Sequence, residues 1–292
     1  MNRGRHASLE RYLAQAGAAL SRGPTALILA EDAVEVGTTL RHHLAAGFRE
    51  VVLLAHPDLL VDPTVEAQVS RVDFDVYAED ALVAAVNLMI PAVAGAWLYY
   101  GYNAEYLFYP FCETRNVREL IAFNFEERRN AFVSFVIDLY AGDLAQFPNA
   151  VSLEEAMLDR TGYYALQRKD EAAGWAAKDR QMDFYGGLRW RFEEHVPWTK
   201  RKIDRIALFR AAPDLRLRPD FTFTDEEYNT YQCQWHHNVT TAICSFRTAK
   251  ALKANPSSRY DIPTFLWRNS IPFEWQSRQL MDLGLMEPGQ WF

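Results

Sequence analysis

The stretch from Trp97 to Tyr140 places the tightest constraint on the fold. An apolar run over 97–100 breaks at Gly101–Glu105 and resumes over 106–110, and a later apolar run ends near Asp138. Short apolar runs that alternate with helical segments are typical of buried strands in an α/β sheet. Such sheets bind ligands at the carboxyl ends of their strands. The sequence therefore predicts an α/β domain with a ligand crevice near Gly101–Glu105.

A βαβ unit is predicted near the start of the chain. Residues 25–30 and 51–55 are short apolar runs, and apolar residues recur at helical spacing over 36–44. A crossover of this kind joins parallel strands. Three acidic residues follow the two strands: Glu31, Asp32 and Asp58. We expect them at the carboxyl edge of the sheet, where a ligand would bind.

Weaker patterns predict the remaining elements. They favour strands over 72–76, 131–140 and 203–210, and helices over 79–90, 119–129 and 240–254. Residues 141–183 are polar without a clear period, which indicates a lid-like or acceptor-side insertion. We expect an N-terminal helix over 1–23, one catalytic-type domain over 24–250 and a helical C-terminal extension over 251–292.

Composition and charge exclude several classes of protein. The formal net charge of −7 offers no overall electrostatic footprint for nucleic acid. Asn87, Pro91 and Gly95 interrupt the longest apolar stretch, so no membrane span is expected. The phosphate loop, dinucleotide fingerprint, nucleophile elbow and zinc-protease motifs are absent from the sequence.

Cysteine usage and the N-terminus indicate a cytoplasmic location. The three cysteines, Cys112, Cys233 and Cys244, are an odd number without a closely spaced pair, which fits a reducing compartment. The first twenty residues have charges spread through them and do not read as a signal peptide.

Several segments resemble family-2-like glycosyltransferases of the GT-A fold. Glu105–Pro110 reads Glu-Tyr-Leu-Phe-Tyr-Pro, which is similar to the second half of that family's "DADEFLVYP" segment, while Tyr102 and Ala104 stand at its Asp positions. Arg41–Phe48 resembles the family's "HHxxLG" helix end. Four later segments also resemble family segments in order: Gly186–Arg191, Lys202–Arg210, Gln234–Asn238 and Ser277–Met286.

The resemblance implies a fold and an activity. The fold would be a GT-A-like, mixed and mainly parallel sheet flanked by helices. The activity would be transfer of a sugar from a nucleoside-diphosphate donor to a glycan or another hydroxyl acceptor, with a divalent metal, Mn²⁺ or Mg²⁺, at the diphosphate. The alternative is a catalytically inactive GT-A-like module that binds a nucleotide, a glycan or a partner protein, because both Asp positions are replaced.

The resemblance also assigns roles to individual residues. Glu31, Asp32 and Asp58 would contact the nucleotide, and Asp138 would be the base on the acceptor side. Two further sets would hold the phosphates: Asn103, Glu105 and His236 as ligands of the metal or diphosphate, and Arg189 and Arg191 as forked phosphate donors.

Each of these roles has a structural alternative. Asn103 would instead shape a turn, Glu105 would pair with an arginine, and His236 would pack in the interior. Asp138 would cap the turn at Gly142. Arg189 and Arg191 would lie on a solvated face. His42 and His43, at a helix end, are expected to be structural.

Overall fold

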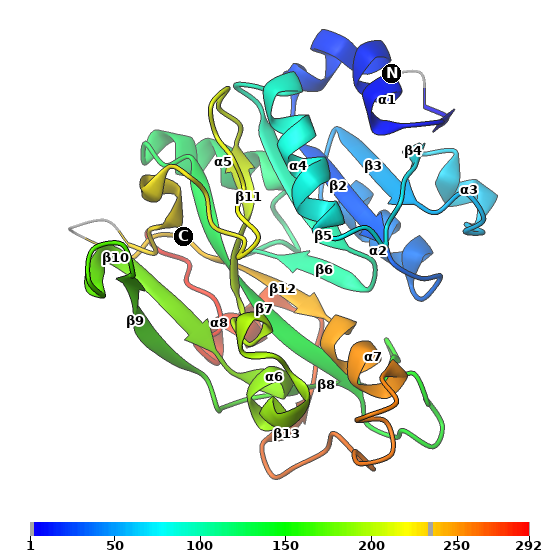
Figure 1. The fold of residues 1–292 in the computed structure, drawn as a ribbon, viewed down its shortest axis with the longest axis vertical. Coiled ribbons are helices and arrows are strands. Elements are labelled where there is room, and N and C mark those ends of the chain that lie inside the picture. The colour runs from blue at the N-terminus through cyan, green and yellow to red at the C-terminus, as the bar shows by residue number, and fades with distance from the viewer. Residues whose placement is uncertain (1–2, 233–235, 292) are drawn as a thin grey trace. The chain divides into compact units, whose positions relative to one another are not determined.

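The computed structural model describes residues 3–232 and 236–291 (Figure 1). The chain divides into two compact units. Unit 1 contains the residues up to Leu107, Thr114–Val133 and Ile206–Asn229; unit 2 contains Phe108–Glu113, Ser134–Arg205 and the residues from Thr230 onward. The chain is an α/β protein with a mixed, largely parallel sheet flanked by helices, which confirms the predicted fold class at that level.

Unit 1 is built on the predicted βαβ unit. Strand β2 (Thr25–Ala30), helix α2 (Val36–Ala45) and strand β3 (Glu50–Ala55) follow one another, and the two strands pair in parallel along their whole length. Both strands are buried throughout, because neighbouring strands cover their edges and helices cover the sheet. Gly47 follows the helix at φ +93°, a conformation that favours glycine and ends helices.

The rest of the unit 1 sheet extends from both sides of this pair. The strand order is β1-β4-β3-β2-β5-β11. Strands β1 (Arg5–His6), β4 (Ser70–Asp73) and β5 (Trp97–Tyr102) run parallel to β2 and β3. Strand β11 (Asp204–Arg210) is antiparallel to β5. The helices are α1 (Leu9–Ala16), α3 (Pro63–Glu66), α4 (Ala81–Ala92) and α5 (Val117–Glu126), with a 3-10 turn at Gly17–Arg22 and another at Glu226–Asn229.

Two predicted elements of unit 1 shift in the structure. The strand expected over 72–76 is β4, and it pairs with β3 and β1, so it is not an edge strand. The helix expected from residue 119 begins at Val117, because the Asn116 side chain accepts hydrogen bonds from two backbone N–H groups and Glu119 bonds back to the Asn116 N–H. This reciprocal cap satisfies donors that the helix itself leaves unpaired.

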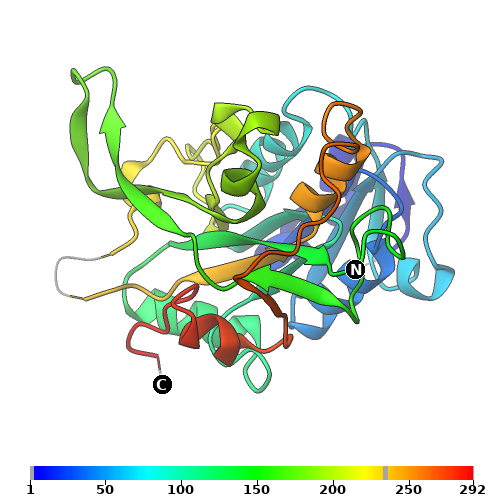
Figure 2. The ribbon, with the colours of Figure 1, turned by 90° about the horizontal axis from the view of Figure 1, so that it is seen from below.

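Unit 2 combines a strand pair, a short ladder and a hairpin. Strand β7 (Ala131–Ala141), which belongs to unit 2 from Ser134 on, pairs in parallel with β12 (Thr241–Ser245). Strand β8 (Ala156–Asp159) joins β7 to β13 (Ser270–Pro272). Strands β9 (Tyr164–Asp170) and β10 (Ala176–Tyr185) form the hairpin that Figure 2 shows in green.

The remaining elements of unit 2 are short. They are helices α6 (Gly187–Arg191), α7 (Arg247–Ala254) and α8 (Ser277–Asp282), and 3-10 turns at Glu193–His195 and Trp198–Lys200. Strand β6 (Glu105–Phe108) begins in unit 1 and ends in unit 2. The final helix agrees with the predicted one at Ser277.

One prediction for unit 2 is wrong, and a second region is more regular than its sequence pattern. Residues 141–183, expected as a lid-like or acceptor-side insertion, contain β8, β9 and most of β10. The sequence gives no strand signal here because β9, Tyr-Ala-Leu-Gln-Arg-Lys-Asp, is largely exposed and does not alternate regularly between apolar and polar residues. The helix expected over 240–254 is a buried strand, β12, followed by α7, because pairing with β7 overrides local propensity.

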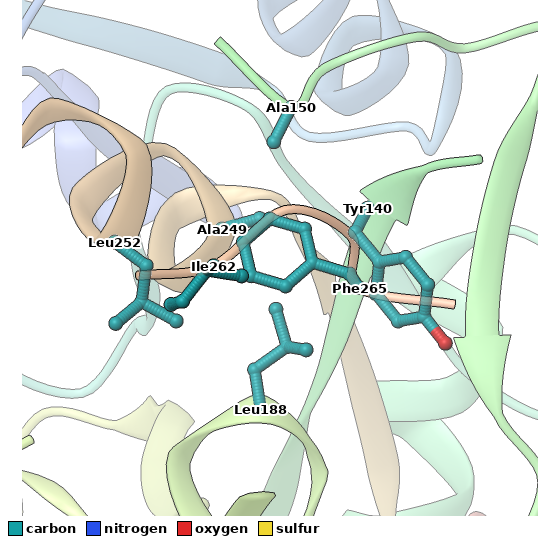
Figure 3. Packing of buried hydrophobic residues seen from close by; sticks show 7 residues of the cluster. All are labelled: Tyr140, Ala150, Leu188, Ala249, Leu252, Ile262 and Phe265. Carbon is teal, nitrogen blue, oxygen red and sulfur yellow. The ribbon is translucent and has the colours of Figure 1, made fainter. Parts of the chain in front are cut away.

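A buried cluster fixes the short helices of unit 2. Leu188 of α6 and Ala249 and Leu252 of α7 pack together with Tyr140 and Phe265, as Figure 3 shows. The Tyr140 and Phe265 rings lie 5.8 Å apart. Because α6 follows directly on β10, this packing sets where the side chains of α6 point.

Two cysteines lie in the described part of the chain. Cys112 and Cys244 are free thiols, and burial raises the pKa of both. Cys233 and the segment Gln234–Trp235 lie outside the described residues. No helix within 3–232 and 236–291 has the length and apolar character needed to cross a membrane.

His43 is a buried neutral group in unit 1. Its Nδ1 lies 2.8 Å from the Thr39 carbonyl oxygen, and its ring packs 4.9 Å from that of Tyr99. A carbonyl only accepts, so Nδ1 carries the proton, and the buried Nε2 has no hydrogen-bond partner. Burial, with His42 as a second cause, lowers the pKa of His43 to about 3. The expectation that His43 is structural agrees with this environment.

Acid should therefore destabilise unit 1 through His43. Below the ordinary pKa of 6.5 and above about 3, the unfolded chain binds a proton that the folded chain does not, so stability falls as pH falls. We expect about 2 kcal/mol to be lost from this group between pH 7 and pH 5. Urea unfolding of wild type, His43→Leu and the exposed-site control His56→Gln at both pH values measures it. Equal losses in wild type and His43→Leu would contradict the assignment.

Candidate functional site

The sheet of unit 1 changes direction beside β2. From β2 the chain adds β3 and β4 on one side, then crosses over through α4 to place β5 on the other side of β2. Parallel strands whose connections leave in opposite directions open a crevice at their carboxyl ends, and open α/β sheets bind ligands there. In this unit the crevice position falls between Ala30 and Tyr102.

Asn103 organises the loop at this position. It is fully buried; its Oδ1 accepts the Glu31 N–H at 3.0 Å, and its Nδ2 donates to Asp32 Oδ1 at 2.7 Å and to the Val34 carbonyl at 2.8 Å. The side chain thus holds the turn that follows β2. The sequence left open whether Asn103 shapes a turn or binds a metal, and in this structure it shapes a turn.

Glu105 has a similar local role. Its side chain is buried, and one carboxylate oxygen accepts the Tyr102 N–H at 2.9 Å across the turn that contains Ala104 at φ +57°. The oxygens of Asn103 and Glu105 that carry these hydrogen bonds do not fit a site for Mn²⁺ or Mg²⁺. His236 belongs to unit 2 and is partly exposed. The crevice predicted to be shared by Glu105 and His236 stays a prediction.

The loop after β3 presents polar groups at the same edge of unit 1. The side chains of His56 and Asp58 are 48% and 92% exposed, and His56 Nδ1 lies 3.6 Å from Asp58 Oδ2. The buried Arg71 guanidinium of β4 holds this loop by donating to three of its carbonyl oxygens, including that of Leu59 at 2.7 Å. A cation bound by several carbonyl groups keeps a surface loop in one conformation.

An exposed aromatic ring completes this rim. Tyr77 is 75% exposed, its hydroxyl donates to the Glu31 carbonyl at 3.3 Å, and its ring centroid lies 6.5 Å from that of His56. Arg5 is half-exposed and donates to Asp73 and to the Pro57 carbonyl. We define the unit 1 rim as Glu31, Asp32, His56, Asp58, Tyr77 and Arg5.

The rim brings together some predicted residues and some that sequence reasoning missed. Glu31, Asp32 and Asp58 follow β2 and β3 as expected. Tyr77, His56 and Arg5 were not predicted, since their proximity depends on how β4 and β1 pair with β3. Together the rim offers an aromatic face, carboxylate oxygens that accept hydroxyl hydrogen bonds, and one arginine.

Asp138 is a buried carboxylate of unit 2. It lies within β7, which continues to Ala141, so it does not cap a turn at Gly142. Its Oδ2 accepts the Leu188 N–H at 2.9 Å. A Cβ at residue 187 would lie 2.8 Å from Oδ2, and Gly187 has φ +62°, so glycine is required for this close approach.

The other oxygen of Asp138 is unusual. Oδ1 is buried without a hydrogen-bond partner, and the nearest guanidinium nitrogen, Arg189 Nε, is 3.8 Å away. Burial raises the pKa of Asp138, and the charge of Arg189 opposes that shift. The Thr248 side chain also hydrogen-bonds Asp138 and opposes the shift. A carboxylate with a raised pKa holds a proton more readily than an ordinary Asp, which suits a general base.

The two predicted phosphate-binding arginines turn inward. Both lie on helix α6. Arg189 donates to the Lys202 carbonyl at 2.6 Å and to Thr248. Arg191 binds both Asp159 oxygens at 3.0 and 3.1 Å. Their side chains are only 15% and 10% exposed, so neither lies on a solvated face.

Asp159 joins a buried network that the sequence did not reveal. Besides Arg191, its Oδ1 accepts the Tyr140 hydroxyl at 2.5 Å and the Trp267 indole N–H at 2.7 Å. The Arg191 guanidinium also lies 4.6 Å from the Trp267 ring centroid. These residues are far apart in sequence. Only their packing shows that Asp159 is a hub, the shared hydrogen-bond acceptor of three side chains.

The comparisons leave the assignment to this geometry. No model of a known protein family matches the sequence, and no curated protein matches it significantly.

Proposed function

We propose that this protein is a GT-A-like glycosyltransferase that transfers a sugar from a nucleoside-diphosphate donor to a glycan or another hydroxyl acceptor. The observation that carries the proposal is the change of direction beside β2, with the polar unit 1 rim at the carboxyl edge. Strand arrangements of this type bind nucleotides at that edge. We also propose a cytoplasmic location, on the odd number of cysteines.

The rim residues suit a nucleotide in complementary ways. Tyr77 provides an exposed ring on which a base can stack. Asp32, Glu31 and Asp58 provide oxygens for ribose hydroxyls or base N–H groups. Arg5 provides a cation for the phosphates. The rim is otherwise acidic, so we expect donor binding to depend on Arg5 and on cations supplied by the solution.

Asp138 suits the chemistry of the acceptor. Its carboxylate would take the proton of the acceptor hydroxyl, and the resulting oxygen would attack the anomeric carbon of the donor sugar. The bond between that carbon and the diphosphate oxygen would break, and the nucleoside diphosphate would leave with the bonding electron pair. The neighbouring Arg189 would favour the carboxylate form before each turnover.

One observation favours a second candidate, a non-catalytic nucleotide-binding module. Tyr102 and Ala104 stand where the similar family has Asp, while Asn103 binds the turn after β2 and Glu105 accepts the Tyr102 N–H. Such a protein would keep nucleotide binding at the rim and lack transfer. The two candidates therefore share the first experiment and differ in the second.

Nucleotide binding should be measured first. A panel of nucleoside diphosphates, each with and without Mn²⁺, should contain one that stabilises the protein by about 2.7 kcal/mol at one hundred times its Kd. Differential scanning fluorimetry reports this as a rise in Tm. Tyr77→Ala should remove the rise, and Tyr260→Ala is the matched control, because that ring is 76% exposed and lies in unit 2.

The outcomes separate the candidates. If no nucleotide raises Tm, or if Tyr77→Ala and Tyr260→Ala behave alike, the rim is not a nucleotide site and both candidates fail. If a nucleotide binds, release of nucleoside diphosphate from its sugar conjugate is then measured. Turnover supports the glycosyltransferase, and binding without turnover for any common donor sugar supports the module.

A further inference from the structure

The β9–β10 hairpin of unit 2 presents a patch outside the residues already assigned. Tyr185 of β10 lies opposite Tyr164 of β9, and Asp183 lies opposite Leu166. Residues two apart on a strand share a face, so these four side chains form one compact group on the same face of the hairpin. Phe184 points to the other face, where its ring packs 4.7 Å from that of Phe135.

Aromatic rings dominate this face. The Tyr185 ring stacks on Tyr164 at 5.2 Å and 16°, and on Trp198 at 5.7 Å and 23°. Tyr185 is thus covered on both sides, while Tyr164 is 41% and Trp198 is 61% exposed. We define the hairpin patch as Tyr164, Leu166, Asp183, Tyr185 and Trp198. The stack holds its two outer rings rigidly at the surface, which lowers the entropy lost when a ligand binds.

A carboxylate lies beside the rings. Asp183 Oδ1 accepts from Arg168 Nε at 2.7 Å and from Lys202 Nζ at 3.3 Å, and within the described part of the chain Oδ2 accepts no hydrogen bond. The side chain is 21% exposed, so a ligand in solution can reach it. The two cations orient Asp183 and offset its negative charge.

We propose that the hairpin patch binds the glycan acceptor. The apolar faces of pyranose rings would stack on Tyr164 and Trp198, and a sugar hydroxyl would donate to Asp183 Oδ2. This combination of rigid aromatic faces with a carboxylate acceptor suits a ligand that is apolar on its ring faces and rich in hydroxyl donors on its edges. The inference rests on the proposed function for the identity of the glycan as acceptor.

A printed glycan array, followed by calorimetric titration of the oligosaccharides it retains, tests the patch on the full chain. We expect Trp198→Ala and Tyr164→Ala each to weaken binding about fivefold, since one stacked ring contributes on the order of 1 kcal/mol. Trp198→Phe should restore most of the affinity. Trp175→Ala is the matched control, because Trp175 is 62% exposed on the same hairpin but lies outside the stack.

The two tryptophan variants test whether glycan binding depends on the hairpin patch. Loss in Trp198→Ala with retention in Trp175→Ala, at unchanged Tm, supports the patch. The inference fails if the array retains no glycan, if both tryptophan variants bind alike, or if Trp198→Ala abolishes self-association in sedimentation but leaves glycan binding intact. Nucleoside-diphosphate binding is measured on the same samples. Glycan binding without nucleotide binding would overturn the proposed function and leave the patch standing, and the converse would overturn the patch alone.

Discussion

The Asp159→Ala variant is expected to lose about 3 to 5 kcal/mol of its free energy of unfolding. The substitution would leave the mostly buried Arg191 guanidinium without its carboxylate and would remove the acceptor of the Tyr140 hydroxyl and the Trp267 N–H. Removing one partner of a buried ion pair lowers the free energy of unfolding by more than the pair itself contributes, because the remaining charge stays buried and desolvated. Helix α6 carries Arg191, so the loss should extend to the position of α6.

Urea unfolding followed by tryptophan fluorescence measures this loss, with Trp267 as a reporter inside the network. The matched control is Asp282→Ala, which breaks the ion pair with Arg278 at 3.5 Å between side chains that are 84% and 69% exposed. Exposed pairs of this kind contribute about 0 to 0.5 kcal/mol. If both variants lose less than about 1 kcal/mol, Asp159 is not the hub that its contacts indicate.

The Asp138→Asn variant is expected to lose sugar transfer by about a hundredfold to ten-thousandfold, the range for a positioned general base. Asn has nearly the same volume, and its amide oxygen can still accept the Leu188 N–H, so the fold should remain. Nucleotide binding at the unit 1 rim should not change. Initial rates with saturating donor, Tm and nucleotide titration separate these effects.

The pH dependence provides an independent check on Asp138. A base must be deprotonated, and burial raises the pKa of this carboxyl, so transfer should fall with decreasing pH at a higher pH than for an ordinary Asp. Asp143→Asn is the control, because Asp143 is exposed and only accepts backbone N–H groups of its own turn. A rate that Asp138→Asn leaves unchanged, or a loss equal to that of Asp143→Asn, would exclude Asp138 as the base.

Elements with local sequence signals could be predicted without the structure. The apolar runs of β2 and β3, the helical period of α2 and the glycine at residue 47 together specify one βαβ unit, and parallel pairing follows from the crossover. Glu31, Asp32 and Asp58 could be placed at the strand ends for the same reason. The fold class and the edge of the sheet that carries polar groups were therefore predictable.

Tertiary structure decided the roles of individual side chains. The sequence offered Asn103 and Glu105 as metal ligands, or as a turn residue and the partner of an arginine, and only the tertiary structure shows which backbone groups they bind. β12 became a strand because β7 was there to pair with it, against a sequence that favoured a helix. Asp159 and the hairpin patch depend on residues brought together from distant parts of the chain. Contacts of this kind leave no periodic trace in a single sequence, because packing and burial, not local propensity, create them.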